Sequence, residues 1–443
     1  MGRSRRQKLP TEAFEVEIES MSHDGRGVTH LDGKAVFIDG ALPGERVRFR
    51  YTAKSRKHDQ GRVEEILDAS PDRVTPRCSH AGICGGCSLQ HLAAEKQIEF
   101  KQQAMLEGLK HIGKVEPDTI LPPLTDNAWG YRHKARLGVR YVIKKKRVLV
   151  GFREKRNSFI ADILRCEVLH PSVGTKIVAL SELIGSMDAA SDIPQIEVAV
   201  SGENTALVFR HLKPLSEGDC LKLKVFSEKQ NVIIFLQSGG ADTVIPLDPE
   251  SQPELTYPLP DYNINLGVEP LDFFQINAGL NNKMLAHALR LLDLQPNDKV
   301  LDLFCGLGNF TLPISRSCAE VIGVEGESSL VKRARDNALK NGITNTRYFT
   351  ANLMSELDSE PWLSETYDKI LLDPPRLGAK EVIPELAKLG AKRIVYVSCH
   401  PGTLARDAGE IVHSLGYKLT DAGVMDMFPH TSHVESIAVF VKG

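Results

Sequence analysis

Hydrophobic and polar positions follow three different rhythms along the chain, and each rhythm predicts a different kind of domain. Between residues 12 and 68, apolar and polar positions alternate over short stretches that are bounded by Asp-Gly and Pro-Gly turns. Alternation with a period of two is typical of half-buried β-strands, and such turns join antiparallel neighbours. The pattern therefore predicts a small antiparallel β-barrel of the OB type over residues 1–70.

The middle of the chain combines one helix with several strands. Residues 91–113 carry apolar side chains about every three or four positions and end near Gly113, which predicts a helix. Strand-like apolar runs follow at residues 132–143, 147–154, 195–202, 205–212 and 231–238. Because the composition changes at Pro71, where a segment rich in Cys and Gly begins, we place a central α+β domain at residues 71–268.

After residue 269, short apolar runs alternate with stretches of helix length. Four of these runs end in polar residues, Gly or Pro: KVLDLFCGLG, EVIGVEGE, DKILLDPP and RIVYVSCHPG. This alternation is typical of βαβ units in a parallel, doubly wound sheet. Residues 269–443 are therefore predicted to form a Rossmann-like α/β domain that binds its ligands beyond the carboxyl ends of the strands.

Composition and charge narrow the class of protein. The 443 residues are 42% hydrophobic and 25% charged, which is typical of a folded chain with more than one domain. No apolar run reaches the ~20 residues of a spanning helix, and the amino terminus lacks an apolar signal region, so we expect a cytoplasmic protein without membrane contact. Basic residues cluster at 46–62 and 131–156. These clusters are either solvated faces or contacts to a polyanion such as RNA.

Three sequence segments with polar residues, each at the end of a predicted strand, indicate a nucleoside cofactor. The Gly-rich segment DLFCGLGNF begins at Asp302, and Glu325 closes the next strand, where a carboxylate can accept both hydroxyls of a ribose. Asp373-Pro374-Pro375-Arg376 ends a later strand. Together these three segments resemble those of class I S-adenosylmethionine-dependent methyltransferases. Amino-group methyltransferases, however, typically carry an aromatic residue at the position of Arg376.

A cysteine at the end of the following strand indicates the acceptor atom. Cys399 occupies the place where the transferred methyl group would be. A thiol there suits carbon methylation, because thiolate addition to C6 of uracil makes C5 nucleophilic. Release of the product then requires a base that removes the C5 proton, and Glu435, just before the last predicted strand, offers a carboxylate.

Four ordered motifs, DLFCGLGNF, LLDPPR, VYVSC and MFPHTSHVE, together with FFQIN at residues 273–277, resemble the RNA uracil-C5-methyltransferase family. The resemblance implies S-adenosylmethionine as methyl donor, Cys399 as nucleophile and Glu435 as proton-abstracting base. It also implies a cofactor pocket lined by Gln275, Phe304, Asn309, Glu325, Asn352 and Asp373. Asp373 and Arg376 could instead face the uracil, whose carbonyl oxygens need polar partners.

The N-terminal part of the chain indicates one branch of that family. Residues 12–68 resemble a TRAM domain, an OB-like RNA-binding module. Cys78, Cys84 and Cys87, with Cys166 as the fourth ligand, would suit a [4Fe–4S] cluster or zinc, and the family resemblance favours a structural cluster. The combination resembles the 23S ribosomal-RNA branch and implies one specific uridine of 23S ribosomal RNA as the target. We expect a monomer, because one chain supplies every part.

Three alternatives stay open at the level of the sequence. The target could be a uridine of transfer RNA or another ribosomal uridine, because target choice depends on RNA shape. The reaction could be N-methylation of a base or a protein amide, which would leave Cys399 and Glu435 without a role. The chain could also be a non-catalytic RNA-binding or chaperone protein that keeps the fold without the reaction.

Overall fold

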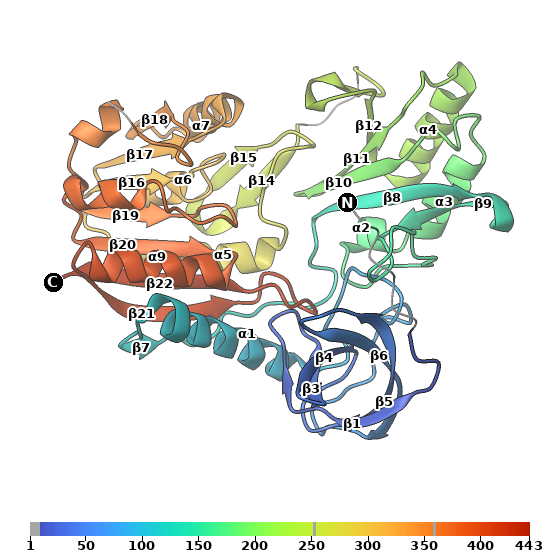
Figure 1. Ribbon diagram of the computed structural model, residues 1–443. Helices are drawn as coiled ribbons and strands as arrows, with labels where there is room; N and C mark the ends of the chain where they lie inside the picture. The colour runs from blue at the N-terminus through green and yellow to red at the C-terminus, as the bar shows by residue number, and fades with distance from the viewer. Residues whose placement is uncertain (1–8, 251–253, 358–359) are drawn as a thin grey trace, which may run out of the picture. The chain divides into compact units, whose positions relative to one another are not determined.

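The computed structural model describes residues 9–250, 254–357 and 360–443, which fall into two compact units. The first unit comprises the chain through Lys101 together with Glu154–Asn157 and Phe428–His433. The second comprises Gln102–Arg153, Ser158–Met427 and Val434–Gly443. Figure 1 shows the elements of both units, and each unit is described by itself below.

The first unit contains a six-stranded barrel. Its strands are β1 (Phe14–Glu17), β2 (Ser20–Met21), β3 (Gly27–Leu31), β4 (Lys34–Asp39), β5 (Arg46–Lys54) and β6 (Asp59–Asp68), in the order β1-β5-β6-β4-β3-β2. Only β4 and β6 pair in parallel. The segment between β1 and β2 closes the barrel, because Ile18 donates to the Glu45 carbonyl and Glu19 to the Val28 carbonyl. The predicted OB-like barrel is confirmed (Figure 1).

The barrel interior follows from the alternation in the sequence. Every second residue of the strands points inward, and the buried cluster consists of Val16, Ile18, Val36, Ile38, Ala41, Val47 and Phe49. Phe49 lies directly over Gly61, where an added Cβ would sit 2.4 Å from the Phe49 ring. Gly61 therefore leaves room for the largest side chain of this core.

The first basic cluster carries less net positive charge than its sequence suggests. Three exposed arginines of β5 pair with carboxylates of β1 and β6: Arg46 with Glu15 and Asp68, Arg48 with Glu65, and Arg50 with Glu64. Such exposed pairs add only about 0–1 kcal/mol each to stability. The cluster at 46–62 is thus partly neutralised by residues that lie outside it in the sequence.

The second unit begins with the central α+β domain. Its sheet has the order β13-β12-β11-β10-β8-β9. The strands are β8 (Lys134–Val142), β9 (Arg147–Gly151), β10 (Gln195–Ser201), β11 (Asn204–Arg210), β12 (Ile233–Gln237) and β13 (Val244–Pro246). The helices are α2 (Pro171–Gly174), α3 (Ile177–Gly185) and α4 (Glu217–Gln230), and α3 and α4 cover one face of the sheet (Figure 1). The five predicted strands are all present.

The catalytic sheet has eight strands in the order β18-β17-β16-β19-β20-β22-β21-β7. Its strands are β16 (Lys299–Leu303), β17 (Glu320–Glu325), β18 (Thr346–Thr350), β19 (Lys369–Leu372), β20 (Arg393–Ser398), β21 (Tyr417–Met425), β22 (Glu435–Lys442) and β7 (Thr119–Ile120). A separate hairpin, β14 (Thr256–Leu259) and β15 (Ile264–Gly267), precedes it. Strands β16 to β20 pair in parallel, whereas β22 is antiparallel to both neighbours.

Helices flank this sheet on both sides. They are α5 (Ala278–Leu292), α6 (Thr311–Ser315), α7 (Ser328–Lys340), α8 (Ile383–Leu386) and α9 (Pro401–His413). The chain moves outward from β16 in both directions, so right-handed connections place α6 and α7 on one face and α8 and α9 on the other. The predicted doubly wound α/β domain is confirmed, and its topological switch point lies between β16 and β19.

The helix predicted at residues 91–113 is α1 (Ala94–Gly108), continued by the π-turn η1 (Leu109–Gly113). Gly113 lies so close to α9 that an added Cβ would be 2.4 Å from the Ala405 carbonyl oxygen. The chain then forms β7, which pairs with β21 at the edge of the catalytic sheet. Part of the segment assigned to the central domain thus extends the catalytic sheet, and the predicted boundaries at residues 70/71 and 268/269 stay predictions.

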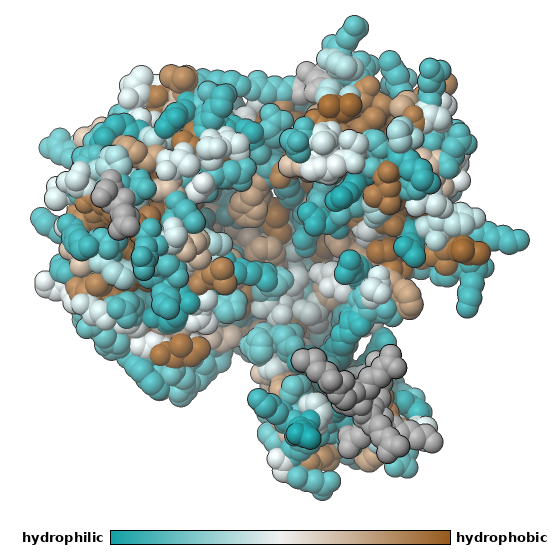
Figure 2. Space-filling view, turned by 45° about the horizontal axis from the view of Figure 1, so that its top comes forward, coloured by the Kyte–Doolittle hydropathy of each residue, from teal (hydrophilic) through white to brown (hydrophobic). Residues whose placement is uncertain are grey.

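The described part of the chain contains no helix with the length and apolar character needed to cross a membrane. On the face shown in Figure 2, hydrophilic residues dominate and hydrophobic residues are scattered among them. Scattered apolar residues are normal on a protein surface.

Candidate active site

The Gly-rich segment after β16 makes a sharp turn at the switch point of the sheet. Phe304 has a positive φ of 66°, and both Phe304 and Cys305 donate their backbone N–H groups to the Val324 carbonyl. Gly306 and Gly308 follow with φ of 53° and 92°. An added Cβ at Gly306 would meet no atom within 4 Å, so the turn borders open space where a ligand can approach the backbone.

Glu325 is fixed at the end of the neighbouring strand, β17. One carboxylate oxygen accepts a hydrogen bond from Gly306 N–H at 3.1 Å. The other accepts from Gly326 N–H at 2.7 Å and Glu327 N–H at 3.1 Å. A carboxylate has about four acceptor positions, so Glu325 keeps about one position for a further donor such as a ribose hydroxyl.

Two asparagines that the sequence analysis did not single out hold the Gly-rich turn in place. Asn281 of α5 is buried and exchanges two amide hydrogen bonds with Asn309, at 2.9 and 3.0 Å. Asn337 of α7 is buried and donates to the Leu307 carbonyl at 3.2 Å. The turn is thus fixed by a helix on each side of it.

Two of the other predicted cofactor residues, Asn352 and Asp373, follow strands at this edge of the sheet, and Gln275 precedes helix α5. Asn352 is exposed beyond β18, and its side chain accepts a hydrogen bond from Met354 N–H at 3.1 Å. Gln275 is half-buried in the segment that leads to Asn277, whose side chain caps α5. Asp373 directly follows β19. Five of the predicted residues thus lie at the carboxyl ends of four adjacent parallel strands: Phe304, Asn309, Glu325, Asn352 and Asp373.

Cys399 and Glu435 are brought together by the register of two antiparallel strands. Ser398, the last residue of β20, pairs with Ser436 of β22. Cys399 follows Ser398 and Glu435 precedes Ser436, so the two are cross-strand neighbours. The parallel register of Leu372 with Tyr396 brings Asp373 to the same end of the sheet.

Burial raises the pKa values of all three groups, and neighbouring carboxylates raise those of Cys399 and Glu435 further. Burial, then the charges of Glu435 and Asp373, raise the pKa of the half-buried Cys399 thiol to about 11. Burial and the charge of Asp373 raise the pKa of Glu435 to about 8, and burial raises that of Asp373 to about 7. Arg376 lowers the pKa of both Cys399 and Glu435. Perturbed pKa values of this kind are typical of catalytic sites.

Comparisons with known proteins agree with this geometry. The family model for TRAM domains matches residues 7–50, and that for tRNA (Uracil-5-)-methyltransferase matches residues 256–442. A protein of Alkalilimnicola ehrlichii, named 23S rRNA (uracil(1939)-C(5))-methyltransferase RlmD, is 51% identical over 100% of this chain and 99% of its own length. A protein of the same name from Stenotrophomonas maltophilia is 51% identical over 100% of both chains.

The chain belongs to the RNA uracil-C5-methyltransferase family. The crystal structure of the tRNA (uracil-54, C5)-methyltransferase of Pyrococcus abyssi, in complex with S-adenosyl-L-homocysteine, shares its fold. The TM-score is 0.73 and the sequence identity 23%, and the match covers 97% of this chain and 100% of that one.

Three of the predicted cluster ligands of this uracil-C5-methyltransferase lie on one tight loop of the first unit. Ala81 donates its N–H to the Cys78 carbonyl at 3.1 Å, and Cys84 donates to the His80 carbonyl at 2.9 Å. Gly86 N–H donates to the Cys84 sulfur at 3.4 Å. Backbone N–H groups directed at sulfur stabilise a thiolate ligand, so this part of the loop fits a metal-binding role.

Cys166, the predicted fourth ligand, belongs to the second unit. Its N–H donates to the Gly174 carbonyl at 2.9 Å, which fixes the loop before α2. Among the residues described by the structure, no group of three or more His, Cys, Asp or Glu side chains is arranged to hold a metal ion. The cluster and its four ligands are therefore a proposal and not an observation.

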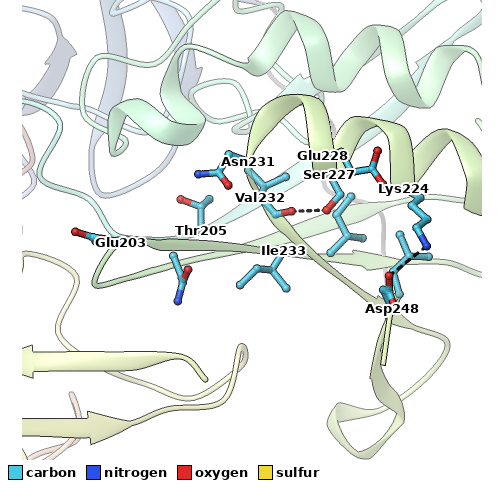
Figure 3. Close-up of a pocket in the computed structure, with 12 residues that line it drawn as sticks. Glu203, Thr205, Lys224, Ser227, Glu228, Asn231, Val232, Ile233 and Asp248 are labelled. Carbon is cyan, nitrogen blue, oxygen red and sulfur yellow. Dashed lines mark hydrogen bonds and ion pairs between the residues drawn. The ribbon is translucent and has the colours of Figure 1, made fainter. Parts of the chain in front are cut away.

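A cavity of about 330 Å³ in the central domain lies apart from all these residues (Figure 3). It lies between α4 and the strands β11 and β12. Its polar groups bond to one another: Lys224 pairs with Asp248 at 3.2 Å, and the Ser227 hydroxyl donates to the Val232 carbonyl at 2.5 Å. The predicted cofactor and catalytic residues do not line it.

Proposed function

We propose that this protein transfers a methyl group from S-adenosylmethionine to C5 of uracil-1939 in 23S ribosomal RNA, the reaction named for relatives that are 51% identical to it. This is also the target that the resemblance of the sequence implies. The observation that carries the proposal is the placement of Cys399 opposite Glu435 at the end of the sheet where the Gly-rich turn lies. N-methylation would use neither group.

The residues around the Gly-rich turn fit the methyl donor. S-adenosylmethionine would supply an electrophilic methyl group on a sulfonium. We propose that Glu325 accepts a hydrogen bond from the ribose, because three backbone N–H groups fix its carboxylate beside the turn and leave an acceptor position. The remaining proposed contacts come from Gln275, Phe304, Asn309, Asn352 and Asp373.

Glu325→Gln should weaken binding of the methyl donor by about 10- to 100-fold. A hydrogen bond to a charged group is worth about 1.5–3 kcal/mol, and the amide loses both the charge and an acceptor. We expect a higher KM for S-adenosylmethionine with kcat nearly unchanged, measured by methyl transfer at saturating RNA. Glu327→Gln, an exposed neighbour, is the control. An unchanged KM for Glu325→Gln would remove Glu325 from the proposed pocket.

The two catalytic side chains would act in sequence. The Cys399 thiolate adds to C6 of the uracil, and the electron pair of the C5–C6 bond makes C5 nucleophilic. C5 then takes the methyl group from the sulfonium. The Glu435 carboxylate removes the C5 proton, the C5–C6 double bond re-forms, and the C6–S bond breaks to return the Cys399 thiolate.

The charges around the site determine how readily Cys399 and Glu435 reach the charged forms that the two steps use. At neutral pH the thiol is protonated, and Glu435 is mostly protonated while the site is empty, because both pKa values lie above 7. Arg376 favours the charged form of each group, since its positive charge lowers both pKa values. We propose that Arg376 assists formation of the thiolate and later of the carboxylate.

The substrate is tested by labelling. Purified protein would be incubated with isotope-labelled S-adenosylmethionine and either 23S ribosomal-RNA fragments or transfer RNA, and the methylated nucleotide mapped. We expect 5-methyluridine at position 1939 and no label in transfer RNA, as the names of the relatives suggest. Label in transfer RNA alone would keep the chemistry and overturn the substrate. Label on a base nitrogen or on protein would overturn the reaction.

We also propose that Cys78, Cys84, Cys87 and Cys166 hold a [4Fe–4S] cluster with a structural role. The N–H group directed at the Cys84 sulfur supports thiolate ligation. Cys166→Ser should lose most of the bound iron and lower the temperature of unfolding, measured by iron content per chain and calorimetry. Cys220→Ser in α4 is the control. Full iron content in Cys166→Ser would remove Cys166 from the proposed ligands, and zinc in place of iron in the wild type would contradict the cluster.

Features of both units support an RNA partner. The TRAM domain belongs to the first unit, and the hairpin of β8 and β9 carries the exposed cations Arg140, Lys144 and Lys146. Clustered cations of this kind contact phosphates without reading sequence. A ribosomal substrate further implies a cytoplasmic enzyme, and we propose that it acts as a monomer.

A further inference from the structure

One face of helix α9 contacts the loop that carries Arg376. The helix begins at Pro401, two residues after Cys399. Thr403, Arg406 and Asp407 share a face, because they are spaced by three and four residues. This face is turned toward the loop at residues 376–379, which follows Asp373-Pro374-Pro375.

Three hydrogen bonds join the helix to consecutive parts of this loop. The Thr403 hydroxyl donates to the Arg376 carbonyl at 3.2 Å, Arg406 Nη2 donates to the Leu377 carbonyl at 2.9 Å, and Ala379 N–H donates to Asp407 Oδ2 at 2.8 Å. The loop is therefore fixed at both of its ends and in its middle.

Gly378 shows how close the two segments are. It has a φ of +82°, and an added Cβ would lie 2.4 Å from Asp407 Oδ2 and 2.5 Å from Arg406 Nη2. A side chain at this position would have to displace the Asp407 carboxylate and the Arg406 guanidinium. The conformation of the loop is thus tied to the position of the Asp407 carboxylate.

Asp407 also holds the strand that leads to the thiol. Its side chain is buried, and its Oδ2 accepts a hydrogen bond from the Tyr396 hydroxyl at 2.7 Å. Tyr396 lies in β20, three residues before Cys399. Arg406 Nε donates to the other oxygen, Oδ1, at 2.8 Å. One carboxylate therefore joins the strand before the thiol, the helix after it and the loop that carries Arg376.

We propose that Asp407 is a positioning residue for the methyl transfer: it fixes the loop at residues 376–379 so that the guanidinium of Arg376 faces Cys399 and Glu435. The inference rests on the proposed function. The charge of Arg376 opposes the charges of Glu435 and Asp373 at the thiol. If the loop is released, the positive charge of Arg376 moves away from the thiol, whereas the carboxylates of Glu435 and Asp373 stay near it. The Cys399 thiolate then becomes harder to form.

The test measures how the rate of alkylation of the Cys399 thiol depends on pH. Wild type and Asp407→Asn would be treated with iodoacetamide across a pH series without RNA, and alkylation of the Cys399 peptide followed by mass spectrometry. We expect the midpoint for Asp407→Asn to move upward by about one pH unit, which is about tenfold less thiolate at neutral pH. We also expect kcat for methylation to fall about 10-fold or more, with KM for RNA within about 3-fold.

A matched control separates positioning from stability. Asp219 is also a buried carboxylate, and it accepts N–H groups from Asp188 and Ala189 at 2.9 and 3.0 Å in the central domain. Asp219→Asn should lower the unfolding temperature without moving the midpoint of Cys399 alkylation. If Asp407→Asn also lowers only the unfolding temperature, its role is structural and the proposal is overturned.

A second variant covers the case in which Asp407→Asn does not fold. Arg406 is exposed, so Arg406→Gln should fold while losing the bond to the Leu377 carbonyl. We expect the pH midpoint of Cys399 alkylation to move upward, by less than in Asp407→Asn. An unchanged midpoint would overturn the proposal. Because alkylation needs no RNA, a shift in a protein that does not methylate RNA would keep the effect of Asp407 on the Cys399 thiol and reject the proposed function.

Discussion

Cys399→Ala should lose methyl transfer by a factor of about 10⁴ or more in kcat. C5 of uracil is not nucleophilic until a thiolate adds to C6, and Cys399 is the thiol that the strand register places opposite Glu435. Binding of RNA and of the methyl donor should change little, since a small, half-buried side chain is removed. The measurement is label transfer to 23S ribosomal-RNA fragments, with RNA binding followed in parallel.

The same variant distinguishes C5 methylation from N-methylation in a test for a covalent protein–RNA adduct. RNA that carries 5-fluorouridine should form a denaturation-stable adduct with the wild type, because fluorine cannot be removed as a proton, and no adduct with Cys399→Ala. Cys318→Ala, a cysteine of the same domain away from the site, should behave like the wild type. Methylation by Cys399→Ala at the wild-type rate would exclude a cysteine nucleophile and favour N-methylation.

Glu435→Gln should trap the enzyme on its normal substrate. The amide has nearly the shape of the acid but cannot take the C5 proton, so addition and methylation proceed while release fails. Turnover should fall by about 10²- to 10⁴-fold. A methylated protein–RNA adduct should accumulate to one per enzyme with ordinary uridine, as seen on denaturing gels. Glu410→Gln, an exposed carboxylate on α9, is the control. Full turnover without an adduct would assign the proton to another base.

The raised pKa of Glu435 gives this step a predicted pH dependence. Burial and the charge of Asp373 raise the pKa of Glu435 from 4.5 to about 8, so the basic form is scarce at pH 7 and grows as the pH rises through 8. The wild-type rate of adduct breakdown should therefore increase between about pH 7 and pH 9. In Glu435→Gln this increase should disappear, and a persistent increase would assign it to a different group.

Much of the fold could be predicted from local pattern. The five strands of the central sheet and the parallel strands of the catalytic domain occur where the apolar runs are, because a strand needs only a few residues of suitable type to be recognisable. Strand β7 has two residues and exists only through its pairing with β21. The sequence predicted no strand there, since nothing local marks so short a segment.

Charge was harder to predict than fold. The cluster at residues 46–62 is basic in sequence, yet Arg46, Arg48 and Arg50 pair with acids of β1 and β6. Those acids are brought near by strand pairing and not by sequence distance. A count of charges along the chain cannot include such neighbours, because electrostatic interactions depend on separation in space.

Part of the candidate site could be predicted from the sequence, and part of it depends on the tertiary structure. The amino-acid sequence by itself determined the family, the Gly-rich turn and the thiol and carboxylate, because these residues lie in short ordered motifs. Only the tertiary structure decided that Cys399 and Glu435 are neighbours and that Asn281, Asn337 and Asp407 support the site. These three residues have no motif of their own. Their role arises from hydrogen bonds across helices and loops that are far apart in the chain, and only the folded backbone brings those partners within reach.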